Sequence, residues 1–254
     1  MAGVGGSNIW GAERYLEFSS RIQACNSREE IISGLLEEIS LFGYDRFVYG
    51  LAIDDRPNFS PYIKLTNVSG GWPEFYLENG LYESDYPLEH CRVETRPLRW
   101  VVLDEWVDTG TIEAKYAKTW KLARKWGLTA GVTIPLPPQG RYLGGVSLIA
   151  PADADKLSQD LVYQKYEQEI LTILQTFHAS VNKGIVAREH YGLSLREVEV
   201  LQMVAEGFLT KNIAAELNTS PHTVEKQIKS ARTRLNARTT PEAVTKAVLL
   251  GLIA

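Results

Sequence analysis

Five basic side chains are concentrated between residues 221 and 238, where Glu225 is the single acidic residue. The basic residues are Lys226, Lys229, Arg232, Arg234 and Arg238. A local excess of positive charge can neutralise phosphate groups, although a solvated helix face is the commoner reason for such a run. Charge alone therefore leaves a nucleic-acid contact and a solvated surface as open interpretations.

Helical periodicity divides this segment into two faces of different chemistry. With about 100° per residue, its apolar side chains share one narrow sector, which predicts the buried face. They are Val224, Ile228, Ala231 and Leu235. The opposite sector is polar and holds His222, Lys226, Lys229 and Thr233, with Glu225 and Ser230 at its edges and Arg232 and Arg234 on its flanks. Lysine can donate to guanine, glutamate can accept from the cytosine amino group, and arginine can bind phosphate, so this face could read DNA.

Four short helices are expected from residue 193 to the C-terminus. Capping signals mark three of the helix starts. They are Ser194 with Glu197, Ser220 with Pro221, and Thr240 with Pro241. The tight turn 218–220 joins the second helix to the polar third helix. A short helix, a tight turn and a second helix form a helix-turn-helix, in which the second helix enters the major groove.

The segment from Leu193 to Ile253 resembles the C-terminal helix-turn-helix domain of LuxR-type regulators over its whole length. The matching motifs are L-[ST]-x-R-E-x-E-V-L at 193–201, Gly207, I-A-x-x-L at 213–217, S-x-x-T-V at 220–224 and a closing G-L-I. Glu225 and Gln227 replace a basic residue and a histidine that are frequent there, which affects the expected operator sequence. The resemblance implies binding to a double-stranded DNA operator. The expected DNA-binding residues are Thr210, Lys211, Ser220, His222, Thr223, Lys226, Lys229, Ser230, Arg232, Thr233 and Arg234.

The first two thirds of the chain carry a signature similar to the ligand pocket of the acyl-homoserine-lactone-binding family. Its residues are Trp72, Tyr76, Asp85, Trp100 and Gly131, and DYPLEHCRVETRPLRW matches without a gap. The resemblance implies that Trp72 donates its indole N–H to the lactone carbonyl and that Asp85 accepts the amide N–H. Tyr76 and Trp100 are then expected to wall the ring, and Ser147 to face the ligand amide. An indole donor and a carboxylate acceptor in an apolar cavity suit a small amphipathic ligand.

Two departures from the family pattern affect this pocket. The family usually has a tyrosine that donates to the amide carbonyl, whereas residues 67–69 are Asn-Val-Ser. Ser147 could replace that donor, or Trp72 could do so if the chain register at Trp72 is shifted. The family also has proline directly after the aspartate, whereas Tyr86 stands there and Pro87 follows. Core packing remains the alternative explanation for any single aromatic residue, and a weaker one for the whole set.

Length and periodicity predict two domains in the 254 residues. The expected fold is α+β, with an α-β-α sandwich sensor at 1–178, a linker at 179–192 and an all-α four-helix domain at 193–254. Helices are expected at 9–22, after Ser27, at 111–126 and at 158–183, and strands at 46–53, 62–67, 131–135 and 143–150. Residues 190–254 carry a net charge of +2 and residues 1–189 a net charge of −6, so the positive charge lies in the expected DNA-binding domain.

Composition and motifs also predict what the chain lacks. No apolar run approaches the roughly 18 residues that span a bilayer, and the N-terminus has no secretory signal, so a cytoplasmic protein without membrane contact is expected. The two cysteines predict neither a disulfide framework nor a metal site. His90 and Cys91 are adjacent and therefore point in different directions, which argues against a nucleophile–base pair and against an enzyme. No cofactor is expected beyond a small-molecule effector, an N-acyl-homoserine lactone.

The expected partners are the autoinducer, the DNA operator, RNA polymerase and a second copy of the chain. A homodimer fits an operator with two-fold symmetry. Its surfaces are expected on the last helix, at Val244, Val248 and Gly251, and on the helix at 158–183. The alternative is a regulator of the same family that is ligand-independent, or senses no lactone, and acts through protein contacts.

Overall fold

The computed structural model describes residues 11–53, 62–137 and 142–254 of the chain. The chain divides into two compact units, the first within residues 1–52 and 65–181 and the second within residues 53–64 and 182–254. None of the described helices has the length and hydropathy needed to span a bilayer.

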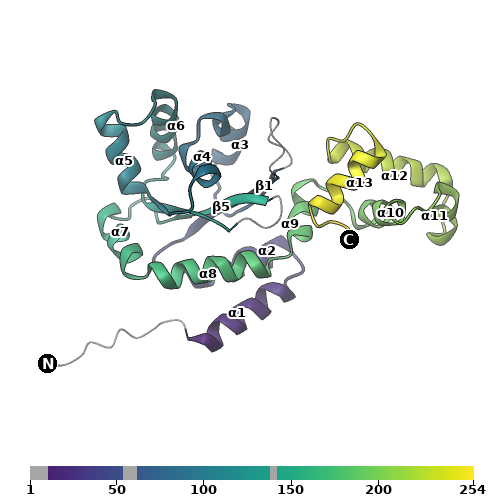
Figure 1. Cartoon of the computed structure of the whole chain (residues 1–254), viewed down its shortest axis with the longest axis horizontal. Helices are drawn as coiled ribbons and strands as arrows, with labels where there is room; N and C mark the ends of the chain where they lie inside the picture. The colour runs from purple at the N-terminus through teal and green to yellow at the C-terminus, as the bar shows by residue number, and fades with distance from the viewer. Residues whose placement is uncertain (1–10, 54–61, 138–141) are drawn as a thin grey trace. The chain divides into compact units, whose positions relative to one another are not determined.

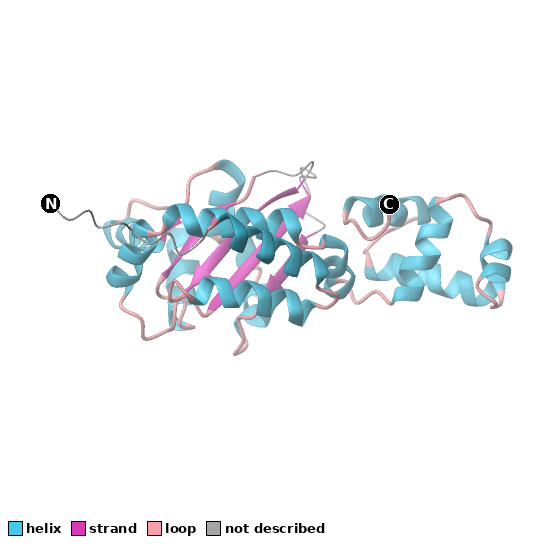
Figure 2. Cartoon of the chain, turned by 90° about the horizontal axis from the view of Figure 1, so that it is seen from below, coloured by secondary structure: helices cyan, strands magenta, loops and turns pink. Residues whose placement is uncertain are grey.

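A five-stranded sheet forms the middle layer of the first unit, with the strand order β2-β1-β5-β4-β3 (Figure 2). The strands are β1 (Arg46–Ile53), β2 (Tyr62–Thr66), β3 (Leu98–Arg99), β4 (Gly131–Pro135) and β5 (Tyr142–Ile149). Strands β3, β4 and β5 pair antiparallel, and the register places Thr133 opposite Ser147. Because alternate residues of a strand point to opposite faces, Gly131 and Thr133 share one face with Gly145 and Ser147.

Helices cover both faces of the sheet, which confirms the expected α-β-α sandwich (Figure 1). One layer consists of α1 (Ala12–Ala24), α2 (Arg28–Ser40) and α8 (Glu167–Ser180). The other consists of α3 (Trp72–Glu78), the 3-10 turn η1 (Leu81–Ser84), α4 (Tyr86–Val93), α5 (Trp100–Thr109) and α6 (Ala114–Lys125). Helix α7 (Lys156–Lys165) connects β5 to α8. The face of Thr133 and Ser147 lies under α4 and α5, because Cys91 abuts Gly145 and Trp100 abuts Gly131.

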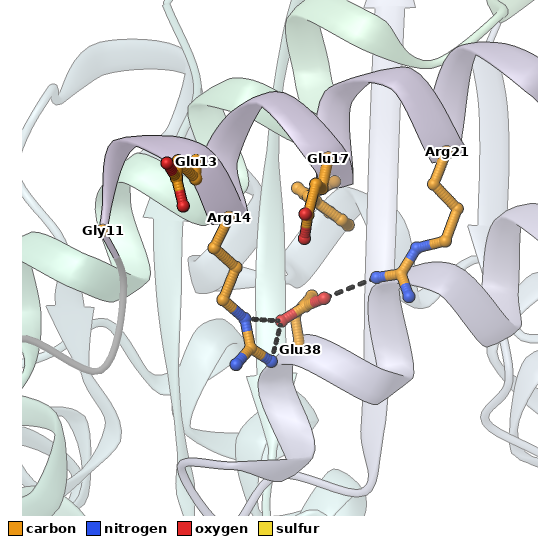
Figure 3. A pocket seen from close by; sticks show the side chains of 7 residues that line it. Gly11, Glu13, Arg14, Glu17, Arg21 and Glu38 are labelled. Carbon is orange, nitrogen blue, oxygen red and sulfur yellow. Dashed lines mark hydrogen bonds and ion pairs between the residues drawn. The ribbon is translucent and has the colours of Figure 1, made fainter.

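Glu38 of α2 forms ion pairs with two arginines of the neighbouring helix α1 (Figure 3). Its side chain is only 5% exposed and accepts hydrogen bonds from Nε of Arg14 at 3.1 Å and from Nη2 of Arg14 at 2.8 Å. Arg21 also donates to it. The two arginines lie about two turns apart on α1, so one buried carboxylate holds the helix at two points. The resulting network is structural.

Residues 182–254 of the second unit form a series of short helices. They are α9 (Lys183–His190), α10 (Leu195–Ala205), α11 (Thr210–Glu216), α12 (Pro221–Arg234) and α13 (Thr240–Leu249). Ser194 and Glu197 form the expected capping box of α10, and the Ser220 side chain accepts from the backbone N–H of Thr223 at the start of α12. The buried core contains Val200, Met203, Ile213, Ala214 and Val224. It fixes α10, α11 and α12 as a helix-turn-helix.

Several expected boundaries differ from the structure. The helix expected at 158–183 is two helices, α7 and α8, separated at Tyr166. The linker expected at 179–192 contains α9, whose N-cap Asn182 accepts from the N–H of Ile185. The N-cap of α13 is Thr239 instead of Thr240, which is the first helical residue. Residues 9 and 10 of the first expected helix lie outside the described residues.

Candidate functional site

The aromatic residues singled out in the sequence meet in one hydrophobic cluster of the first unit. Trp72 and Trp100 are 8% and 4% exposed and belong to this cluster, and Tyr76 packs against it. The ring centroids of Trp72 and Tyr76 lie 5.7 Å apart. Gly71, with φ of 84°, sets the chain direction into α3 at Trp72, because glycine adopts the left-handed region without a Cβ clash.

Asp85 lies at the N-cap of α4 and is linked to the cluster through Tyr76. The phenol of Tyr76 donates to Oδ2 of Asp85 over 2.7 Å. Burial raises the pKa of Asp85 to about 6, since the loss of hydration outweighs the opposing effects of Tyr76 and of the backbone N–H of Leu88. Tyr76 therefore acts as a hydrogen-bond donor to Asp85, in addition to the expected packing of its ring against the ligand. The pair offers a carboxylate that can accept a further hydrogen bond.

Trp100 and Ser147 are joined by a residue that the sequence analysis did not identify, Thr133. The indole N–H of Trp100 donates to Oγ1 of Thr133 over 2.9 Å, and Oγ1 of Thr133 lies 2.9 Å from Oγ of Ser147. The Trp100 ring also meets Trp120 edge to face, with centroids 5.0 Å apart. The signal that could have found Thr133 is its place two residues after Gly131 on a strand neighbouring the strand of Ser147.

Gly131 has a packing role at this site. A Cβ there would lie 3.0 Å from the Trp100 ring and 2.3 Å from the carbonyl oxygen of Leu148. Its glycine identity therefore allows the Trp100 ring to pack directly against β4. Gly131 supports the site through Trp100, and no side chain of its own is available to touch a ligand.

Trp72 has an indole N–H that makes no hydrogen bond to any residue in the described part of the chain. Its ring packs against Phe75, Tyr76 and Trp126. Val68, one of residues 67–69 where the family resemblance predicts a phenol, is buried in the same cluster. Trp72, Tyr76 and Trp100 therefore belong to the cluster or pack against it, and Asp85 bonds to Tyr76. Ser147 is linked to Trp100 through Thr133, and Gly131 packs against Trp100. The unused hydrogen-bonding groups of these residues are a donor on Trp72 and an acceptor on Asp85.

Helix α12 of the second unit has the two faces that its periodicity predicts. Val224, Ala231 and Leu235 are buried, and Ile228 packs partly buried against the core. The opposite face is solvent-exposed, with His222, Glu225, Lys226, Lys229 and Thr233. Lys211 on α11 is exposed as well, whereas Thr210 is half-buried. A surface hollow of about 460 Å³ lies among the starts of α11 and α13 and the middle of α12, lined in part by Thr210, Glu225 and Lys229.

Five other expected DNA-binding residues have structural partners within the second unit. Ser220 caps α12 and bonds to the hydroxyl of Thr223. Arg232 donates to the carbonyl oxygen of Arg238, and Arg234 forms an ion pair with Glu197, with Nε 3.3 Å from Oε1. Burial opposes ionisation of Glu197, but Ser230, Ser194 and Arg234 together hold its pKa below the usual value. The flanking arginines are therefore oriented by the protein itself.

Comparisons with known proteins agree with this two-part arrangement. Residues 27–181 match the family model of the autoinducer-binding domain, and residues 192–247 match that of bacterial regulatory proteins of the luxR family. The chain is 28% identical over 246 residues to the transcriptional activator protein VanR of Vibrio anguillarum, which covers 94% of this chain and 96% of VanR. It is 24% identical over 261 residues, and over 100% of both chains, to the quorum-sensing regulator RhlR of Pseudomonas aeruginosa. The crystal structure of Escherichia coli SdiA has a similar fold, with a TM-score of 0.52, 23% identity and coverage of 95% of this chain and 98% of SdiA.

Proposed function

Because the chain belongs to the LuxR family of bacterial regulatory proteins and carries its autoinducer-binding domain, we propose that it is a quorum-sensing transcription regulator that binds an N-acyl-homoserine lactone. It acts in the cytoplasm as a homodimer on a two-fold symmetric operator and engages RNA polymerase. The observation that carries the proposal is the convergence of Trp72, Asp85 and Ser147 around one aromatic cluster.

The chemistry of these groups supports an acylated lactone as the ligand. Trp72 supplies an indole donor for the lactone carbonyl, and Asp85 supplies an acceptor for the amide N–H. The surrounding apolar side chains of the cluster suit an acyl chain, since ligand sites combine apolar walls with a few polar groups. The buried Val68 in place of a phenol is the observation that favours the second candidate, a family member that senses no lactone.

The second unit supports DNA binding by a dimer. The exposed lysines of α12 suit base edges and phosphates in the major groove. On α13, Val248 is 47% exposed and Val244 is partly exposed, so this helix offers apolar surface to a symmetry mate. Two copies related by two-fold symmetry would place two recognition helices about one turn of DNA apart.

Ligand binding can be tested by mass spectrometry under native conditions and by thermal melting of the full chain. The probes are N-acyl-homoserine lactones from butanoyl to dodecanoyl, with the ring-opened acids as matched controls. We expect one lactone to add its mass and to raise the melting temperature, because a ligand that binds the folded state stabilises it. The variant Trp72→Phe keeps an aromatic side chain and removes the indole N–H, so it should weaken this effect.

The result that would count against the lactone proposal is equally direct. If no lactone adds mass or shifts melting while the protein still binds a two-fold operator in gel-shift assays, the second candidate is correct. Equal effects of lactones and ring-opened acids would remove the lactone carbonyl from the recognised groups.

A further inference from the structure

Helix α6, in the helical layer on one side of the sheet (Figure 1), carries five basic residues and no acidic residue among its 12 positions. From its exposed side we infer that α6 is a docking surface for a short acidic segment of another protein, one that also carries apolar side chains. Lys118, Lys121 and Lys125 form the charged part of this surface and are called the lysine stripe. Leu122 and Trp126 form its apolar part. The inference depends neither on the proposed ligand nor on the proposed operator.

The lysine stripe occupies one narrow face of α6. At about 100° per residue, its three members fall within a sector of about 60°, and Lys118 and Lys125 lie about 10 Å apart along the helix axis. All three are exposed, and no described residue forms a hydrogen bond or an ion pair with any of them. Lys115, near the start of the helix, differs in this respect because it pairs with Glu113 at 3.4 Å. The positive charge of the stripe is therefore uncompensated within the described part of the chain.

Other side chains fix α6 to the first unit. The indole N–H of Trp120 donates to Oδ1 of Asp104 over 2.8 Å, and Arg124 pairs with the same oxygen at 3.1 Å. The stripe takes no part in these contacts. Like charges three or four residues apart destabilise a helix, and the helix dipole favours cations only in the last turn. Lys118 and Lys121 therefore contribute nothing to the stability of α6, so we look for their role outside the described part of the chain.

Apolar side chains lie along one margin of the lysine stripe. Leu122 is partly exposed and lies about 40° from Lys118 around the helix. Trp126, the C-cap residue, is 39% exposed although its ring packs against Phe75 with centroids 5.6 Å apart. A solvated lysine face is the alternative explanation of the stripe, but such a face needs no apolar neighbours. Protein interfaces, in contrast, combine aromatic side chains at the centre with charged groups at the rim.

The surroundings of the stripe favour a short protein segment over DNA or a lipid bilayer. DNA and an anionic bilayer are extended surfaces of one sign of charge. Helix α3, whose Phe75 packs against Trp126, also exposes Glu74 and Glu78, and residues 1–189 carry a net charge of −6. An extended anionic surface is repelled by these carboxylates, whereas a short segment can contact the stripe alone. Phosphate groups also offer no apolar partner to Trp126.

The test measures the binding of a fluorescein-labelled acidic peptide to the full chain by fluorescence anisotropy. The peptide is rich in glutamate and carries two phenylalanines, and a matched peptide has serine in place of each phenylalanine. The triple variant Lys118→Gln, Lys121→Gln, Lys125→Gln should weaken binding of the phenylalanine peptide by about tenfold at about 50 mM salt, since exposed ion pairs are individually weak and screened by salt. Because all three side chains are exposed, melting curves of this variant should match those of the unmodified chain.

A charge-matched control distinguishes the stripe from the net charge of the chain. The triple variant Arg92→Gln, Arg96→Gln, Lys165→Gln removes the same charge from other exposed positions of the first unit. It should bind the peptide within about twofold of the unmodified chain. Equal losses in the two triple variants would refute the proposal, because the peptide would then recognise net charge and not the stripe.

The two peptides test the apolar part of the surface. The serine peptide should bind the unmodified chain about fivefold more weakly than the phenylalanine peptide, because it cannot bury apolar surface against Leu122 and Trp126. Trp126→Ala should weaken binding of the phenylalanine peptide and leave the serine peptide unchanged, which is the coupling expected of groups in contact. Equal affinities of the two peptides for the unmodified chain would refute the proposal without recourse to this variant.

The remaining outcomes decide the class of partner. A scrambled DNA duplex and phosphatidylcholine vesicles with about a quarter phosphatidylglycerol serve as the other anionic probes. Replacing the stripe by glutamine should leave the affinity of the full chain for both probes within about twofold. A larger loss on either probe than on the phenylalanine peptide would overturn the proposal in favour of a nucleic acid or a bilayer. Lactone binding is measured separately, so its failure would leave these results and their interpretation unchanged.

Discussion

Replacing Asp85 by asparagine should stabilise the ligand-free sensor while weakening its response to ligand. The carboxylate is buried beside Tyr76, and burial raises its pKa to about 6 from an ordinary value of 3.8. A raised pKa means that the folded chain holds the Asp85 proton more tightly than the unfolded chain. Ionised Asp85 therefore destabilises the folded state, and Asp85→Asn removes that charge without removing the side chain.

The size of this effect follows from the pKa difference. Each pKa unit corresponds to about 1.4 kcal/mol, so the ionised carboxylate costs about 3 kcal/mol of folding stability. The cost is fully present above pH 6 and disappears as the pH falls below 3.8, where both states are protonated. For a domain of this size, about 3 kcal/mol shifts the melting temperature by roughly 6 to 12 °C. Asp85→Asn should therefore melt higher at pH 8 and about equally at pH 4.

Tryptophan fluorescence provides the assay, because all six tryptophans precede residue 127 and report on the first unit alone. Asp104→Asn is the matched control, since Asp104 is also buried but accepts from Trp120 and pairs with Lys156 and Arg124. That variant should lower the melting temperature at pH 8. Lower stability of Asp85→Asn at pH 8 would refute the reasoning, because it would mean that the ionised carboxylate is favourable in the folded chain.

Two further predictions concern the second unit. Lys226→Ala should weaken binding to the preferred operator by about 1–3 kcal/mol and binding to scrambled DNA much less. Arg234→Ala should weaken binding to the two duplexes alike and reduce the salt slope of binding by about one. Anisotropy over a salt series measures both effects, and equal losses of Lys226→Ala on operator and scrambled DNA would place the base contacts elsewhere. Val248→Asp should abolish the dimer in sedimentation experiments with operator and ligand present, because it places a charge in the apolar surface of α13, and an unchanged dimer would exclude that surface.

Local signals made the second unit predictable from sequence. The capping box at Ser194 and the buried face of α12 depend on residues a few positions apart, so a short stretch of sequence is enough to predict them. The break at Tyr166 was not predictable in this way, because apolar spacing continues through it from α7 into α8. Helix α9 was missed because Val186 and Ala187 alone are buried in it, which gives no stripe.

The clustering of the expected ligand residues was predictable from the sequence, but the hydrogen bonds among them were not. Matching residue types and separations placed Trp72, Asp85 and Trp100 together. Which atom bonds to which depends on the pairing of β4 with β5, and that register brings Thr133 to Ser147 across 2.9 Å. A threonine in a strand is ordinary, and its place two residues after Gly131 becomes informative only once the pairing of β4 with β5 is known. The expected wall residues Tyr76 and Trp100 also proved to be hydrogen-bond donors.

The polar groups of the sensor suggest why ligand binding and folding should be coupled. The Trp72 N–H has no acceptor among the described residues, and burial holds the pKa of the Asp85 carboxyl above its ordinary value. The ionised carboxylate lowers the stability of the folded sensor, since a buried charge needs partners. The proposed ligand would supply a partner to each group, through its lactone carbonyl and its amide N–H. Its binding energy would then add to the stability of the first unit, so the amount of folded, dimeric regulator would follow the concentration of the signal.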